Sequence, residues 1–126
     1  MITPNPKSAL LLFAHGSSDP GWAAPFVKLK AAIQARDADR RIELAFLERM
    51  QPSFDDAVAT LQKQGIAEIT VAPIFLAIGG HMRNDLPKLI EGTQLRTGII
   101  FKVLPALGEA DVLIGAIADW VTDAAQ

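Results

Sequence analysis

The residues of this chain whose types and positions best suit chemistry are His15, Glu48 and His81. Each follows a short apolar run, and the two histidines are the only ones among the 126 residues. Two imidazoles and a carboxylate suit a borderline divalent ion such as Co²⁺, Ni²⁺, Fe²⁺ or Zn²⁺. Three protein ligands leave coordination positions open for water or a substrate. A site from which an ion can be transferred needs such open positions. We therefore predict a divalent metal site, in which His15 or His81 also accepts protons as the catalytic base.

Four apolar runs predict the strands that must position these side chains. They cover residues 9–14, 42–47, 69–76 and 99–104. The first and third runs are apolar almost throughout, as expected of parallel strands that are covered on both faces. The second and fourth each contain one charged residue, which favours places nearer the edges of the sheet.

Apolar residues at helical spacing predict a helix after each strand. The four stripes lie within residues 22–33, 54–61, 86–90 and 112–120. Asp85 is the predicted N-cap of the third helix, which places Pro87 in its first turn, where a missing N–H is harmless. Trp22 and Trp120 lie at core spacing in the first and last helices, so both are expected to pack inside the protein.

Strands and helices that alternate in this way predict one α/β domain over residues 1–126. The expected architecture is an open parallel four-stranded sheet with helices on both faces and the flavodoxin-like strand order 2-1-3-4. Neighbouring strands lie about 4.8 Å apart, and ligands bind at the carboxyl ends of such strands. We therefore expect His15, Glu48 and His81 to converge at this edge of the sheet.

Composition excludes several other classes of protein. The net charge is −2 with no basic stripe, which argues against a nucleic-acid partner. No run approaches the roughly 20 apolar residues that cross a bilayer, so no membrane association is expected. The chain has no cysteine, which excludes disulfides and cysteine-ligated iron–sulfur clusters. The N-terminus does not read as a signal peptide, and a cytoplasmic location is expected.

Polar residues beside the predicted metal ligands are candidate substrate contacts. The turn containing Ser17 is expected either to form an anion-binding nest or only to connect a strand to a helix, with Asp19 near the helix cap. Gly80 lets the backbone approach a bulky flat ligand. Arg83 is expected either to pair with substrate carboxylates or to remain a solvated surface charge.

Three segments of the sequence resemble a known family. FAHGSSDP, ELAFLE and PIFLAIGGHMRNDLP occur in this order, and the resemblance runs from about residue 9 to residue 89. They are similar to segments of the small sirohydrochlorin chelatases, the CbiX/SirB group of class II chelatases. One position departs from the pattern, because Ser18 stands where the family commonly has arginine. The loss of this cation bears on binding of the many-carboxylate substrate more than on the fold.

The resemblance implies a chelatase fold and insertion of Co²⁺ or Fe²⁺, with Ni²⁺ in one branch, into sirohydrochlorin. The family's metal-binding residues correspond to His15, Glu48 and His81. The metal is a substrate, and neither a nucleotide nor an iron–sulfur cluster is expected. Longer relatives hold two such domains, so a short chain is expected to pair as a homodimer.

Two other functions stay open from the sequence. A metal or tetrapyrrole carrier on the same fold would use the same side chains without catalysis, and Ser18 favours this alternative. A histidine phosphatase also places His-Gly after its first strand. That class has arginine directly before the histidine, where this chain has Ala14, so it is the weaker alternative.

Overall fold

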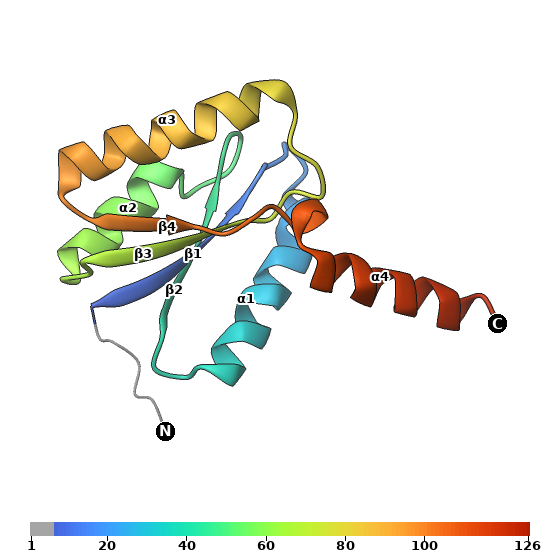
Figure 1. Cartoon of the computed structure of the whole chain (residues 1–126). Coiled ribbons are helices and arrows are strands. Elements are labelled where there is room, and N and C mark those ends of the chain that lie inside the picture. The colour runs from blue at the N-terminus through green and yellow to red at the C-terminus, as the bar shows by residue number, and fades with distance from the viewer. Residues whose placement is uncertain (1–6) are drawn as a thin grey trace.

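The computed structural model describes residues 7–126 as an alternation of strands and helices (Figure 1). In chain order the elements are β1 (Ser8–Ala14), η1 (Pro20–Ala23), α1 (Ala24–Arg36), β2 (Arg41–Phe46), α2 (Phe54–Lys63), β3 (Glu68–Pro73), α3 (Gly80–Thr97), β4 (Ile100–Val103), η2 (Leu107–Glu109) and α4 (Asp111–Ala124). The two η elements are single turns of 3-10 helix. None of the helices in this part of the chain is long and apolar enough to cross a membrane.

The strands form one parallel sheet in the order β2-β1-β3-β4. This confirms the predicted α/β class and strand order, including the edge positions of β2 and β4. Leu12 of β1 pairs with Leu44 of β2 on one side and with Ala72 of β3 on the other. The carboxyl ends of β1, β2 and β3 therefore lie side by side, and the switch in chain direction falls at β1.

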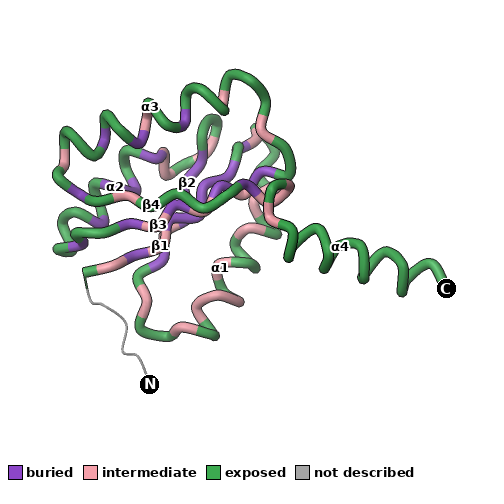
Figure 2. Tube along the Cα trace, viewed as in Figure 1, coloured by how far each residue is buried: buried purple, intermediate pink, exposed green. Residues whose placement is uncertain are grey.

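The main core lies between the sheet and helices α2 and α3, which cover the same face (Figures 1 and 2). Phe13 of β1 is fully buried there and contacts the rings of Phe54 and Phe75 at centroid distances of 5.3 and 5.9 Å. A smaller cluster lies on the opposite face, where α1 packs against β2 and β1. Trp22 joins this cluster through Phe26, at a ring distance of 4.6 Å, which confirms its predicted packing.

Ser53 defines the start of α2. Its hydroxyl accepts a hydrogen bond from the backbone N–H of Asp56 at 3.1 Å, as in a helix N-cap. Replacing Ser53 with alanine is expected to destabilise the fold by about 1 kcal/mol, which lowers the melting temperature by roughly 4 °C. Thermal unfolding followed by circular dichroism measures the shift. Thr60→Ala, on the exposed side of the same helix, is the matched control, and equal shifts in both variants would refute the capping role.

The start of α3 differs from the prediction. The helix begins at Gly80 with Gly79 as N-cap, so Asp85 and Pro87 lie inside it, and the predicted Asp85 N-cap is wrong. The N–H of Arg83 already donates to the carbonyl of Gly79 at 3.0 Å. Packing of Met82 and Leu86 against the main core holds this early turn, and it outweighs the cost of one proline inside the helix. As a result, His81 lies in the first turn of a helix rather than in a loop.

The environment of α4 also differs from the prediction. The helix spans the expected residues, but it projects from the body of the molecule, and none of its residues is buried (Figure 2). Trp120 is 71% exposed, so the expectation that it packs inside the protein is wrong. Helical spacing indicates that one face is apolar, but it does not say which surface covers that face.

Candidate metal and tetrapyrrole site

His15 and Glu48 are placed by the carboxyl ends of β1 and β2. His15 directly follows β1, and Glu48 comes two residues after β2. Parallel pairing continues beyond the strands, because the N–H of Leu47 donates to the carbonyl of Ala14 at 2.9 Å and the N–H of Glu48 to that of His15 at 3.1 Å. The backbone of both residues is thus held by hydrogen bonds to the sheet.

Gly16 permits this close approach of the segments that follow β1 and β2. Its φ is +97°, a conformation that side-chain-bearing residues rarely adopt. A Cβ at this position would lie 1.9 Å from the carbonyl oxygen of Glu48. Glycine is therefore required both by the backbone conformation and by the space beside Glu48.

The side chains of His15 and Glu48 contact each other. Nε2 of His15 lies 3.1 Å from Oε1 of Glu48, and both side chains are about half exposed to solvent. Two donor atoms that bind one ion at about 2.1 Å each, roughly 90–100° apart, are themselves separated by about 3.0–3.2 Å. An ion could therefore replace the shared proton without a large movement of either side chain. The guanidinium Nε of Arg49 lies 3.8 Å from the same carboxylate oxygen.

 

A largely apolar pocket opens beside His15. The pocket measures about 560 Å³. Its apolar lining includes Leu47, Phe75, Ile78, Met82, Leu86 and Leu89. The ring of Phe75 stands edge-on to the imidazole of His15, at a centroid distance of 6.2 Å and an interplanar angle of 88°. Apolar walls with a few polar groups suit the flat apolar face of a ligand.

His81 lines the same pocket as His15, together with Gly80. The structure nevertheless does not bring all three predicted ligands together. Within residues 7–126, no three histidine, aspartate or glutamate side chains are placed closely enough to hold one metal ion. His15 and Glu48 are two of the three predicted ligands, whereas His81 is an exposed residue that lines the pocket.

Ser17 and Arg83 have other contacts in this structure. The hydroxyl of Ser17 accepts a hydrogen bond from the N–H of Asp19 at 3.1 Å, and Asp19 in turn caps η1. Asp19 thus lies at the cap of η1. Arg83 lies 3.5 Å from Glu109 and borders a neighbouring hollow rather than the pocket that contains both histidines.

The family model named CbiX matches residues 9–124, which is most of the chain. The chain belongs to the CbiX family. This confirms the resemblance found in the three sequence segments, and it extends the similarity through α4.

Known relatives of this CbiX chain are sirohydrochlorin cobaltochelatases. The protein of that name from Methanothermobacter thermautotrophicus is 33% identical over 85 residues, which cover 68% of this chain and 59% of the relative. The one from Methanocaldococcus jannaschii is 35% identical over 82 residues, which cover 65% of this chain and 57% of the relative. The matched region thus spans less than two thirds of the length of these relatives.

Solved structures of CbiX and SirB proteins share the fold. A putative cobalamin biosynthesis CbiX protein from Marinobacter aquaeolei superposes with a TM-score of 0.82 and 34% identity, covering 92% of this chain and 95% of the other. The sirohydrochlorin chelatase SirB from Bacillus subtilis subspecies spizizenii, in complex with cobalt, gives a TM-score of 0.76 at 24% identity. That match covers 93% of this chain and 50% of SirB, and at this identity it shows the fold alone.

One wall of the pocket in this CbiX chain was not predicted from the sequence. Met82, Asp85, Leu86 and Leu89 all line the pocket from α3. Their spacing continues from His81 as one face of a helix, so the signal was present in the sequence. It was missed because the helix was expected to start at Asp85.

Proposed function

We propose that this chain inserts a divalent metal ion into sirohydrochlorin or a closely related tetrapyrrole without using ATP. The observation that carries the proposal is the 3.1 Å separation of His15 Nε2 and Glu48 Oε1 beside an apolar pocket that His15 and His81 both line. The names of the archaeal relatives, sirohydrochlorin cobaltochelatase, support the same reaction.

The proposed metal ligands are His15, Glu48 and His81. His15 and Glu48 already have the separation that one ion requires, and His81 would complete the set by turning its exposed side chain across the pocket. We propose Co²⁺ as the first substrate to test, with Fe²⁺ and Ni²⁺ as alternatives that the same donor atoms accept. The name of the archaeal relatives, sirohydrochlorin cobaltochelatase, supports Co²⁺ as the first choice.

We propose that the tetrapyrrole lies against the apolar wall of the pocket, and that the metal site is at the edge of this wall. Gly80 borders the pocket and leaves space for the macrocycle, since no atom lies within 4 Å of the position where a Cβ would be. Arg83 would contact a substrate carboxylate only after leaving Glu109, and Ser17 only after its turn opens. We therefore propose Gly80 as the primary substrate contact and the other two as secondary contacts.

Metal insertion releases two protons from the pyrrole nitrogens for each divalent ion that enters. A neutral imidazole can accept a proton near neutral pH. His15 and His81 border the space for the macrocycle, and Nε2 of His15 lies 3.1 Å from Oε1 of Glu48. The same three side chains thus deliver the ion and receive the protons.

A spectroscopic assay tests the proposal. Sirohydrochlorin and Co²⁺ are mixed with and without the protein, and the visible spectrum of the macrocycle is followed. A rate well above that of spontaneous insertion is expected. Binding of the tetrapyrrole without faster insertion would instead identify a carrier and refute the proposed enzyme. His81→Ala is expected to slow the protein-dependent rate by at least roughly 10-fold.

We propose that residues 1–126 act as one domain in the cytoplasm and that the working form is a homodimer. No nucleotide, nucleic acid or membrane is needed for the proposed reaction.

A further inference from the structure

Helix α4 has an apolar surface without a partner in the described chain. Val112, Ile114, Ile117, Trp120 and Val121 are between 41% and 79% exposed. Isolated helices of about 14 residues are marginal in water even with favourable sequences. The helix therefore needs a surface to cover its apolar side chains.

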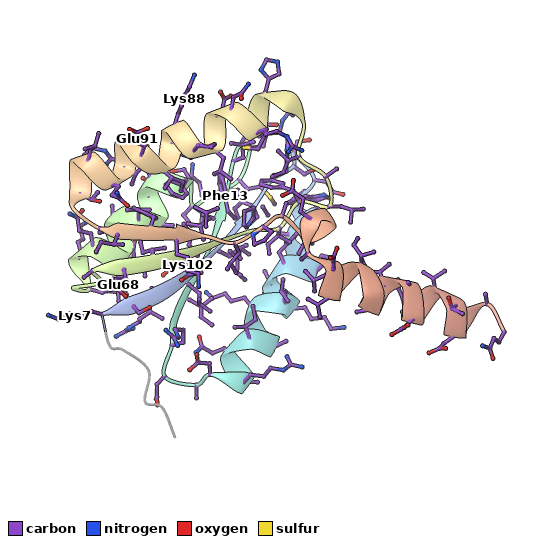
Figure 3. All side chains as sticks on the ribbon, in the orientation of Figure 1. Lys7, Phe13, Glu68, Lys88, Glu91 and Lys102 are labelled. Atoms are coloured by element: carbon purple, nitrogen blue, oxygen red, sulfur yellow. The ribbon has the colours of Figure 1, made fainter. Side chains whose placement is uncertain are left out.

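One face of the sheet also lacks a helix. On the side where α1 packs, α1 covers β2 and β1, while Ile100 of β4 remains 62% exposed. Lys102 is exposed on the same side, because it alternates with Phe101, which packs against the main core. Figure 3 shows Lys102 and Phe13 on opposite sides of the sheet. In a sheet of this strand order, the helix after β4 belongs on this open face.

The connection after β4 directs α4 away from its own sheet. The N–H of Leu104 donates to the carbonyl of Val71 at 2.9 Å, and the N–H of Leu107 to that of Phe75 at 3.0 Å. Gly108 packs so closely that a Cβ would lie 1.8 Å from the carbonyl oxygen of Leu76. These contacts fix η2 and leave the open face of β3 and β4 unfilled by the chain's own helix.

We propose that two copies of this chain exchange α4, so that the helix of each lies across β3 and β4 of the other. One chain carries both the apolar helix and the open face, which is the arrangement that a twofold, self-complementary interface requires. The helix carries three aspartates and no lysine or arginine, and Lys102 offers them a cation on the receiving face.

The exchange also affects the candidate site. In this fold the helix after β4 starts at the carboxyl edge of the sheet, so the partner's α4 would begin beside the pocket. The two pockets would then lie near each other, and each copy would border the other's substrate. This inference rests on the proposed homodimer and names the surface that forms it.

Cysteine cross-linking tests the exchange, because the chain has no cysteine of its own. Lys102→Cys and Ile117→Cys chains, one carrying a larger tag, are co-expressed and treated with a short bis-maleimide. A product that joins the two different chains is expected. Glu91→Cys, on α3 at the opposite face, replaces Lys102→Cys in the control and should give no such product with Ile117→Cys.

The other outcomes separate the exchange from the dimer. A third chain carries both Lys102→Cys and Ile117→Cys. If the cross-link forms only within this chain, then α4 folds onto its own sheet, and this result would overturn the exchange. A dimeric mass without the cross-link would overturn the exchange and leave the proposed dimer standing. A mass of 13.5 kDa in solution would overturn both.

A charge placed on α4 gives an independent readout. Ile117→Asp is expected to raise the dimer dissociation constant by at least about 30-fold, the effect of losing an interface hot spot. Light scattering across a dilution series measures this. Leu95→Asp is the matched control, because Leu95 is an 82% exposed apolar residue on α3 and should not affect dimerisation. Equal dissociation constants for the two variants would overturn the proposal.

Discussion

Replacing His15 with alanine is expected to lower the affinity for Co²⁺ by at least roughly 100-fold. Loss of a hydrogen-bonding partner behind a metal ligand already costs about 10- to 100-fold, and loss of the ligand itself should cost more. His15 provides one of the two donor atoms that the structure already places 3.1 Å apart. Isothermal titration with Co²⁺ at constant pH measures the change.

Variants of two glutamates provide the controls for this experiment. Glu48→Gln removes the charge of the second donor and should weaken Co²⁺ binding in the same direction. Glu91→Gln removes the same charge from the exposed side of α3 and should leave the affinity unchanged. An unaltered Co²⁺ affinity in His15→Ala would refute the metal site, whereas equal losses in both glutamine variants would indicate an effect of net charge alone.

Much of the fold could be predicted from the sequence because burial on both faces leaves a clear pattern. The apolar run around Leu12 is buried on both sides of the sheet, and the charged residues Glu43 and Lys102 lie in the two edge strands. Alternation of strands with helical stripes then restricts the topology to very few arrangements. The strand order followed from these rules.

Features that depend on tertiary contacts could not be predicted in this way. The first turn of α3 is held by packing of Met82 and Leu86, not by a local capping residue. Trp120 lies on an apolar stripe, but its exposure depends on the direction that η2 gives to α4. Periodicity shows that a face is apolar without identifying its partner.

The candidate site was predicted in part. Strand ends placed His15 beside Glu48, because parallel neighbours share an edge of the sheet. The same argument brought His81 to this edge but not to the same point, since its side chain belongs to the first turn of α3. Topology determines the edge of the sheet at which the side chains gather, whereas the distances between them depend on the direction of each side chain.

Gly16→Ala is expected to lower both the stability of the fold and the affinity for metal. A side chain at φ +97° costs about 1–2 kcal/mol, and the added Cβ would also overlap the carbonyl oxygen of Glu48. We expect a loss of at least about 2 kcal/mol, or roughly 8 °C in melting temperature. Gly92→Ala, where no atom lies within 4 Å of the new Cβ, should be neutral or stabilising because it lies within α3.

The metal affinity of folded Gly16→Ala separates a local effect from a general loss of stability. Relief of the overlap must move the backbone of Glu48 away from His15, so Co²⁺ affinity should fall even at temperatures where the variant is folded. Leu61→Ala removes a fully buried side chain in α2 and should cost about 2–5 kcal/mol without moving either ligand. If the two variants bind Co²⁺ equally well when folded, then the close packing of Gly16 against Glu48 does not position the metal site.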